Sequence, residues 1–344
     1  MVKKYLCVGM LVVSLLLQSV TLIGSAKTVD YQLLNSKESA LQGDTATQVL
    51  LASSQISQDE LKKQQEQLAK DQAQLKKDQE QLKKAQEQLK KDQEELKKAQ
   101  DQLKKAQETL DIQTKTKKLN SEITSKTYLN YLKKLGYYKK VYKNDEKLNI
   151  RNTLLLFQSD HNMSVTGNWD DATKAMLINR LVSPTFTYID TIKQVPTTGK
   201  WIVVNKTNRT LTLYENTNVI KKYAVAVGNP STLTKTGKFI VTSRLIDPYW
   251  GGGGFADPIK GGVPENPLGS RWLGINRTDG SYGIHGTNSL YSIGKYISHG
   301  CIRMQNYCIE ELFPLVPMNA NVWVGTASEL KKWGITQNPF EVQK

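Results

Sequence analysis

Two histidines stand close to one cysteine near the end of this 344-residue chain, which contains three histidines in all. His285 precedes Cys301 by 16 residues, and His299 precedes it by two. A thiol becomes a strong nucleophile when a base takes its proton, or when positive charge such as that of Arg303 lowers its pKa from about 8.5. Glycines beside the histidines leave backbone N–H groups open to an oxyanion. These residues predict a nucleophilic thiol with either histidine as its base, and by themselves they indicate a site rather than a particular reaction.

Three other interpretations of the cluster stay open at this point. A structural zinc site would use both histidines with Cys301 and Cys308, but the spacings of 14, 2 and 7 residues match no common zinc pattern. A disulfide between the two cysteines would silence the thiol, whereas a buried thiol at Cys308 suits the helix expected there. The histidines could also serve only to pack a core.

Short strand-like runs surround the cluster and must position it. The first two runs flank the polar segment 205–209, which predicts a hairpin, and a helix is expected over about 306–313. Neither βαβ alternation nor a phosphate-binding glycine loop occurs, so a parallel nucleotide-binding sheet is not expected. If the chain is extended between them, His299 and Cys301 point to the same side. The predicted strands are residues 201–204, 210–214, 223–227, 238–242 and 322–324.

The cluster resembles the catalytic domain of the L,D-transpeptidase family (YkuD-like). The match is a histidine, a gap of about a dozen residues, and then Ser298-His-Gly-Cys301 followed by an apolar residue and Arg303. Over about residues 199–326 the resemblance implies a mainly β, β-sandwich-like catalytic domain, which we assign to residues 197–344. The other matching segments are 227–231, 236–239, 266–269 and 282–287.

That resemblance implies a role for each residue. Cys301 is the expected nucleophile, and His285 is the expected proton acceptor and donor, oriented by the carbonyl of Gly286. Cys301 would attack the third residue of a peptidoglycan stem tetrapeptide and release D-alanine, and an amine of a neighbouring stem would then take the thioester. No metal and no organic cofactor is implied. The remaining candidates are His299 in the catalytic machinery and Ser298, Gly300, Arg303, Tyr282 and Trp272 in substrate binding.

Two rival functions remain beside this one. A cell-wall cysteine peptidase, such as an L,D-carboxypeptidase or an amidase, would pass the acyl group to water. A wall-binding protein with an inactive catalytic domain is the non-enzymatic rival, and the intact pair of His285 and Cys301 speaks against it.

Four consecutive glycines, 251–254, lie between Trp250 and Phe255 in the same domain. Glycine runs do not hold one conformation at low cost. The segment predicts a lid with aromatic tips over the donor peptide, and an ordinary long loop is the alternative.

Residues 119–195 predict a small helical module. Apolar residues at helical spacing end at Gly136, a second apolar run covers 154–158, and Asp170 opens a third helix. Most of this stretch resembles the three-helix peptidoglycan-binding module, which implies glycan binding. The segment 139–144 departs from that family, because lysines stand where a glycine-containing loop is usual. An inert spacer domain is the alternative.

Residues 57–118 predict a long helix that acts as a spacer. The segment contains neither proline nor glycine and is dominated by strong helix formers. Leucine recurs at every seventh position, but only one position of each heptad is apolar, which is half of a coiled-coil seam. We expect a largely solvated, coiled-coil-like stalk, with weak self-association as the alternative. The leucines are Leu61, Leu68, Leu75, Leu82, Leu89, Leu96, Leu103 and Leu110.

The chain begins with a basic, then apolar, then small-residue pattern over residues 1–26, which is typical of a secretory signal peptide. An uncleaved membrane anchor is the alternative, and a linker follows over 27–56. Of the net charge of +15, an excess of +11 falls on residues 119–344. A secreted or wall-associated multidomain protein is expected, with anionic peptidoglycan stem peptides and glycan as partners rather than nucleic acid.

Overall fold

The computed structural model describes residues 45–183, 185–196, 199–275 and 282–340. The chain divides into two compact units, residues 1–99 and residues 100–344. The expected signal peptide lies outside the described residues, as does the first part of the expected linker. Across the described ranges, no helix is both long and apolar enough to cross a membrane.

The helix α2 (Thr45–Glu122) contains the whole of the expected stalk and begins inside the expected linker. Its leucine stripe faces solvent, with between 47% and 71% of each leucine exposed. Side chains four residues apart contact each other along the helix, as in the Glu80–Lys84 ion pair at 3.1 Å and the Gln67–Asp71 hydrogen bond at 2.9 Å. Helix propensity and local pairs of this kind therefore account for α2 without an apolar partner.

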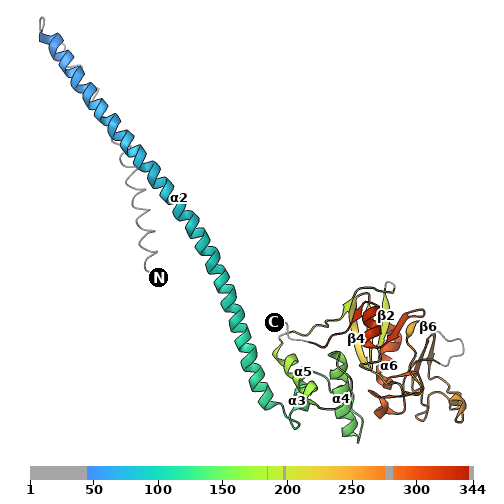
Figure 1. Ribbon diagram of the computed structural model, residues 1–344. Coiled ribbons are helices and arrows are strands. Elements are labelled where there is room, and N and C mark those ends of the chain that lie inside the picture. The colour runs from blue at the N-terminus through green and yellow to red at the C-terminus, as the bar shows by residue number, and fades with distance from the viewer. Residues whose placement is uncertain (1–44, 184, 197–198, 276–281, 341–344) are drawn as a thin grey trace. The chain divides into compact units, whose positions relative to one another are not determined.

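Three further helices in the second unit pack around an apolar core that also includes residues from the end of α2 (Figure 1). Asp145 and Asp170 each accept a backbone N–H from the first turn of the helix that follows, as N-cap residues do. Gly136 adopts φ = 83°, the left-handed conformation with which glycine ends a helix. The similarity to a glycan-binding module stays a prediction. The helices are α3 (Tyr128–Lys134), α4 (Glu146–Asp160) and α5 (Asp171–Val182).

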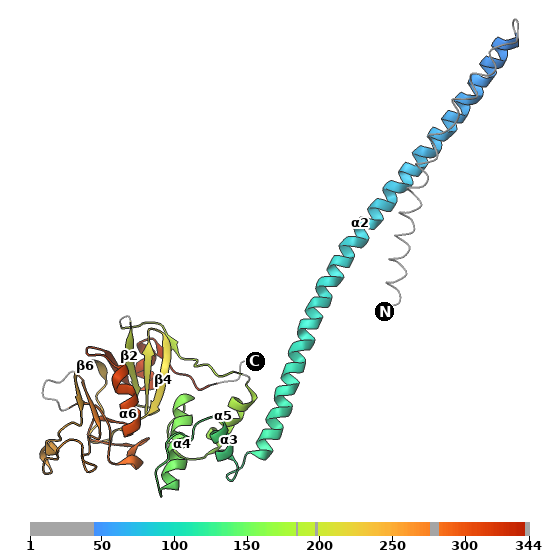
Figure 2. The ribbon, with the colours of Figure 1, turned by 180° about the vertical axis from the view of Figure 1, so that it is seen from behind.

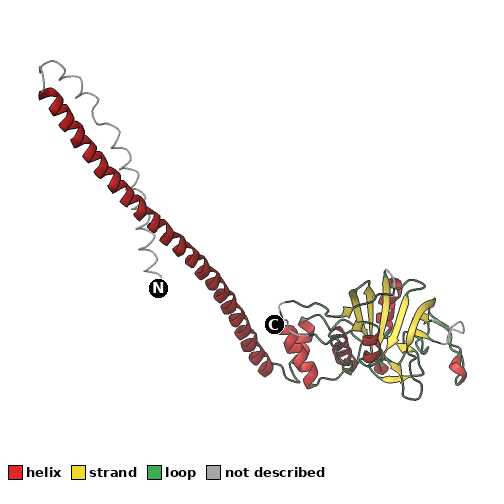
Figure 3. Cartoon of the chain, turned by 45° about the horizontal axis from the view of Figure 1, so that its top comes forward, coloured by secondary structure: helices red, strands yellow, loops and turns green. Residues whose placement is uncertain are grey.

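In the described ranges, eight strands join one sheet in the order β10-β8-β7-β6-β11-β2-β3-β4, drawn in yellow in Figure 3. The neighbours β2 and β11 are parallel, as are β8 and β10, and the other neighbours are antiparallel. The strands of this sheet are β2 (Lys200–Asn205), β3 (Thr210–Glu215), β4 (Asn218–Ala224), β6 (Gly237–Ile246), β7 (Arg271–Ile275), β8 (Gly283–His285), β10 (Ile302–Arg303) and β11 (Asn321–Gly325). Two smaller pairs are β1 (Thr191–Ile192) with β12 (Ile335–Thr336) and β5 (Val227–Gly228) with β9 (Tyr296–Ser298).

The strand β6 makes this sheet curl. Its residues up to Ile240 pair with β11, and its residues from Val241 onward pair with β7, with a register shift at the change. The two half-sheets contribute side chains to one apolar core. The expected sandwich is therefore wrong in one respect: its two layers are halves of a single sheet, because one strand of ten residues is long enough to serve both.

The helix α6 (Asn306–Leu312) begins where the sequence predicted it, and it contributes Cys308, Ile309 and Leu312 to that core. Figure 2 shows α6 close to the sheet beside β2 and β4. The remaining helices are α7 (Ala327–Lys332) and the 3-10 turns η1 (Gly252–Gly254), η2 (Leu290–Ser292) and η3 (Phe313–Leu315).

The strand expected at 223–227 is misplaced. β4 ends at Ala224, and Ala226 then forms an isolated bridge with Arg303 on β10, which is the opposite edge strand of the same sheet. Ala226 and Arg303 exchange backbone hydrogen bonds, each of 2.9 Å. Alternating large and small residues suit pairing with β3 and pairing with Arg303 equally well, so the pattern could not locate the end of β4.

Polar contacts join the helices to the β domain within the second unit. Arg151 on α4 donates to the carbonyl of Ile293 at 2.6 Å. Lys222 on β4 forms a buried ion pair with Asp190 at 2.5 Å. Because a buried charge is costly without a partner, these contacts hold the two parts against each other.

His161 follows α4 and is buried in an aromatic cluster. Its ring centroid lies 4.2 Å from that of Phe157 and 4.8 Å from that of Phe186. Its Nδ1 lies 2.7 Å from the carbonyl oxygen of Phe157 and must donate, since a carbonyl only accepts. Burial lowers the pKa of His161 to about 4, so this histidine is neutral in the fold at pH 7.

The contribution of His161 to the free energy of unfolding is expected to fall as the pH drops from about 6.5 towards 4. Its pKa is about 4 in the fold, whereas an unfolded histidine has a pKa of about 6.5. The unfolded chain binds more protons in that window, so acid favours unfolding by up to about 3 kcal/mol. Urea unfolding of the wild type and His161→Phe across this range isolates the effect, and equal pH slopes for both would contradict it.

Candidate active site

His285 lies on strand β8, next to the edge strand β10, and its neighbours on both sides hold it in place. It pairs with Trp272 on β7 and with Arg303 on β10. The Trp272 ring stacks on the imidazole with 5.7 Å between centroids. This residue, which was expected to bind substrate, thus packs against His285. Nδ1 of His285 lies 2.6 Å from the carbonyl oxygen of Gly286 and must donate to it. Nε2 is therefore the basic atom of the ring.

Burial, together with the charge of Arg303, lowers the pKa of His285 to about 4, against the opposing effect of hydrogen bonds to the backbone of Gly286 and Leu268. The imidazole is therefore neutral at pH 7. A neutral imidazole can accept a proton, which is what a general base requires.

Cys301 directly precedes β10, the strand that pairs with the strand of His285. The parallel register pairs Ile302 with Ile284, and both of these side chains are buried in the core. The thiol of Cys301 interacts with the backbone of Gly283, which lies on β8 two residues before His285. The thiol and the imidazole are therefore both positioned by β8.

The environment of the thiol differs from the sequence-based expectation. Burial raises the pKa of Cys301, although a hydrogen bond to the Gly283 backbone and the charge of Arg303 both act to lower it. The expected lowering by positive charge is therefore outweighed by desolvation. At pH 7 the resting site holds a thiol and a neutral imidazole rather than an ion pair.

The loop before Cys301 is held by hydroxyl groups. Ser298 Oγ donates to the carbonyl of Cys301 at 2.5 Å and accepts from the Gly300 N–H at 3.2 Å. Thr232 Oγ1 donates to the Ser298 carbonyl, and Thr234 Oγ1 donates to the Gly300 carbonyl, both at 2.8 Å. Gly300 adopts φ = 117°, which other residues rarely adopt. Ser298, expected to bind substrate, is thus buried and shapes this loop.

The two glycine N–H groups expected to face an oxyanion are already engaged. The Gly286 N–H donates to the carbonyl of Arg271 at 3.2 Å, and the Gly300 N–H donates to Ser298 Oγ. The guanidinium of Arg303, which lowers the pKa of Cys301 through its charge, is the remaining candidate donor among the predicted residues.

The structure places His299 in the turn between β9 and β10, outside both strands. The extended segment expected here is interrupted, because β9 ends at Ser298 and β10 begins at Ile302. The exposed ring of His299 instead lies 5.2 Å from the ring of Phe255, which in turn lies 5.9 Å from Trp250. One aromatic residue of the expected lid, Phe255, thus contacts His299, and the lid itself stays a prediction.

Tyr282 and the second cysteine complete the expected positions. Tyr282 is buried, and its hydroxyl donates to the Lys235 carbonyl at 3.3 Å. Neither Cys301 nor Cys308 forms a disulfide, so that alternative is wrong, and Cys308 lies in the core. Within the described ranges, no three histidine, cysteine or acidic side chains are placed to share a metal ion.

Asn306, at the start of α6, is a site residue that the sequence analysis missed. Its Oδ1 accepts from the Thr287 N–H at 3.0 Å and from the Ser270 N–H at 3.3 Å. A Cβ on either Gly269 or Gly286 would overlap this oxygen. Asn306 therefore positions the carbonyl that orients His285. The glycines in two separate matching segments were the available signal, since glycine often marks a close approach.

Replacing Asn306 with alanine is expected to leave two backbone N–H groups without an acceptor and to lower the free energy of unfolding by about 1–3 kcal/mol. Misplacement of Gly286 should also lower kcat, by roughly tenfold or more. Asn306→Asp keeps an acceptor and should retain most of the stability. Asn288→Ala removes a nearby exposed amide and is the matched control. Chemical unfolding and steady-state kinetics measure both effects, and equal results for Asn306→Ala and Asn288→Ala would contradict them.

Comparison with known proteins adds an independent observation. A family profile described as the YkuD L,D-transpeptidase catalytic domain matches residues 199–324, which include His285 and Cys301. YqjB of Bacillus subtilis (strain 168), named as an L,D-transpeptidase, is 41% identical over 127 residues, which are 36% of this chain and 70% of that protein. YkuD of the same organism, named likewise, is 40% identical over 123 residues, which are 36% of this chain and 64% of that protein.

Solved structures were compared as well. An L,D-transpeptidase from Mycobacterium smegmatis is 19% identical with a TM-score of 0.31, covering 37% of this chain and 58% of that chain. The chain spans between 62% and 70% of the length of the three Bacillus relatives it matches. With 41% identity over most of the first relative, the chain belongs to the L,D-transpeptidase catalytic domain family.

Proposed function

We propose that this chain is an exported L,D-transpeptidase that cross-links peptidoglycan stem peptides through a thioester on Cys301. The observation that carries the proposal is the pairing of β8, which contains His285, with β10, which begins directly after Cys301. The neutral state of both groups at pH 7 supports general-base activation during attack rather than a preformed thiolate.

The reaction proceeds in two balanced steps. Nε2 of His285 takes the thiol proton while the sulfur of Cys301 bonds to the carbonyl carbon of the third stem residue. The bond to D-alanine breaks, and the proton passes from His285 to the leaving amine. An amine of a neighbouring stem then attacks the thioester, His285 takes its proton, and that proton returns to the departing sulfur.

Masses of the products test this function. The purified full chain is incubated with disaccharide-tetrapeptides, and the mixture is followed by mass spectrometry. Dimers that have lost one D-alanine support cross-linking, whereas monomers that have lost it support the L,D-carboxypeptidase alternative. Unchanged substrate would contradict both and leave only the wall-binding alternative.

We also propose that this chain lies outside the cell. Its helical module would hold it at the wall, and α2 would act as a spacer. The basic excess on residues 119–344 suits an anionic wall matrix. Fractionation of cells and sedimentation of the full chain with purified wall test the location and the docking. Analytical ultracentrifugation over a range of concentrations tests the weaker expectation that the leucine stripe of α2 self-associates.

A further inference from the structure

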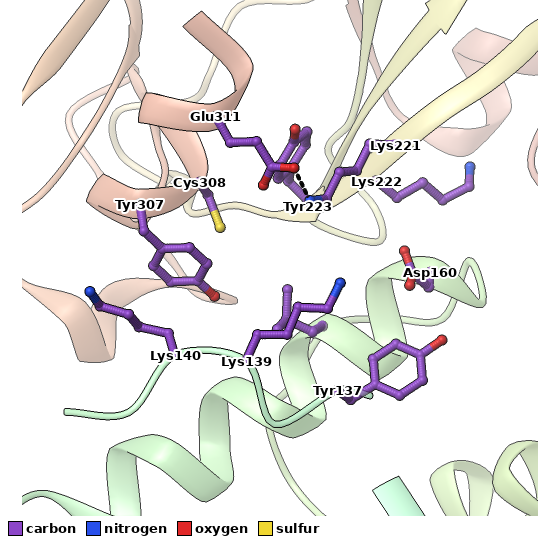
Figure 4. A pocket seen from close by; sticks show the side chains of 11 residues that line it. Tyr137, Lys139, Lys140, Asp160, Lys221, Lys222, Tyr223, Tyr307, Cys308 and Glu311 are labelled. Atoms are coloured by element: carbon purple, nitrogen blue, oxygen red, sulfur yellow. Dashed lines mark hydrogen bonds and ion pairs between the residues drawn. The ribbon is translucent and has the colours of Figure 1, made fainter. Parts of the chain in front are cut away.

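A cavity of about 140 Å³, which Cys301 does not line, lies between the helical part and the β domain of the second unit (Figure 4). Its walls come from the segment between α3 and α4, from α4 itself, from β4 and from α6. The side chains that line it are mixed in charge, with lysine the commonest. They are Tyr137, Lys139, Lys140, Leu156, Asp160, Lys221, Lys222, Tyr223, Tyr307, Cys308 and Glu311.

The charges around this cavity leave a positive excess. Lys221 is paired with Glu311, and Lys222 is paired with Asp190 outside the cavity. Lys139 and Lys140 form no ion pair within 4 Å in the described part of the chain.

The charges of Lys139 and Lys221 converge on the cavity wall. Both lower the pKa of the Cys308 thiol, which burial raises to about 12. Lys139 also acts on Asp160 and lowers the pKa of that carboxyl, although burial raises it overall. The ammonium groups thus reach the cavity from two different elements, the segment before α4 and the strand β4.

A second observation points to a ligand independently of the lysines. Tyr223 lines the cavity and is fully buried, yet its hydroxyl has no hydrogen-bond partner among the described residues. Burial raises its pKa, so the hydroxyl keeps its proton and can donate. A buried polar group without a partner costs about 1–3 kcal/mol, which a bound acceptor would relieve.

We propose that this cavity binds a compact oxyanion, either a carboxylate or a phosphate group. Lys139 and Lys140 would supply the charge, and the Tyr223 hydroxyl would supply a directed hydrogen bond. The volume suits one such group rather than a sugar ring with a peptide attached. The two sources on an anionic wall would be the carboxylate of a small peptide or amino acid and the phosphate of a polymer. The binding is independent of catalysis at Cys301.

Thermal unfolding of the full chain tests the proposal, with sodium phosphate and sodium acetate as probes and sodium chloride at equal ionic strength as the reference. A saturable rise in Tm of roughly 3–6 °C is expected at tenfold Kd of the preferred probe. The probe that gives the rise identifies the source as phosphate or carboxylate. No saturable rise with either probe would overturn the proposal.

Variants assign any rise to the cavity. The double change Lys139→Gln with Lys140→Gln should remove at least half of the rise, as should Tyr223→Phe, which keeps the ring and so the packing. Lys331→Gln with Lys332→Gln removes the same charge from exposed positions on α7 and should leave the rise intact. A rise that survives Tyr223→Phe would place the anion on the outer surface and overturn the assignment. The Tm of each variant without probe shows that it folds.

Discussion

Cys301→Ala is expected to reduce formation of cross-linked dimers by at least about 10³-fold, with the Tm within a few degrees of the wild type. The sulfur is the atom that would form the proposed thioester, and the paired side chains of His285 and Arg303 cannot form one in its place. The side chain is only partly buried, so its loss leaves a small void. Product masses measure the activity, and far-ultraviolet circular dichroism with heating measures the fold.

Cys308→Ala is the matched control for this change. The second thiol is buried in the core on α6, and its raised pKa keeps it protonated. Its loss should cost about 1 kcal/mol of stability but change the cross-linking rate by less than about twofold. Iodoacetamide should likewise inactivate the wild type by modifying Cys301 alone. Substantial cross-linking by Cys301→Ala would contradict the assignment of the nucleophile. So would a folded Cys308→Ala that has lost its activity without any treatment with iodoacetamide.

His285→Ala is expected to lower kcat/KM by about 10²–10⁴-fold, the usual contribution of a general base. His299→Ala should lower it by less than about tenfold, because that ring is exposed and contacts Phe255, whereas His285 is buried beside β10. This pair of variants separates two histidines that the sequence left open as bases. Equal losses, or a larger loss for His299→Ala, would reassign the base.

The pH profile of kcat/KM should also identify His285 as the base. The wild-type rate is expected to stay level between about pH 5 and 8 and to fall below a midpoint of about 4, where His285 gains a proton and can no longer accept one. Circular dichroism at each pH separates this loss from acid unfolding. A midpoint near 6.5 would show that the imidazole is solvated. It would contradict the explanation that a buried His285 acts as the base.

Much of the fold followed from local patterns in the sequence. The seven-residue leucine spacing and the absence of proline and glycine predicted α2, since helix formation depends on residues a few positions apart. Gly136 and Asp170 marked helix ends correctly because capping is also local. The histidine, the Ser298-His-Gly-Cys301 run and the other matching segments were sufficient to predict the family, whereas the chemistry at Cys301 stays a proposal.

The features that were mispredicted depend on contacts between distant segments. The curl at β6 and the true end of β4 follow from which strands pair, and alternation of residue types is the same for either partner. The engagement of the Gly286 and Gly300 N–H groups is likewise invisible in a motif, because their acceptors belong to the packed structure.

The chemical state of the site also lies beyond the reach of a motif. Positive neighbours suggested a lowered pKa for Cys301, but the thiol and His285 are buried together, and desolvation moves both pKa values toward the neutral forms. Residue identities along the chain specify which groups can react. Parallel pairing of β8 with β10 and exclusion of water then set which groups meet and how they are charged, because both arise only when segments far apart in sequence pack together.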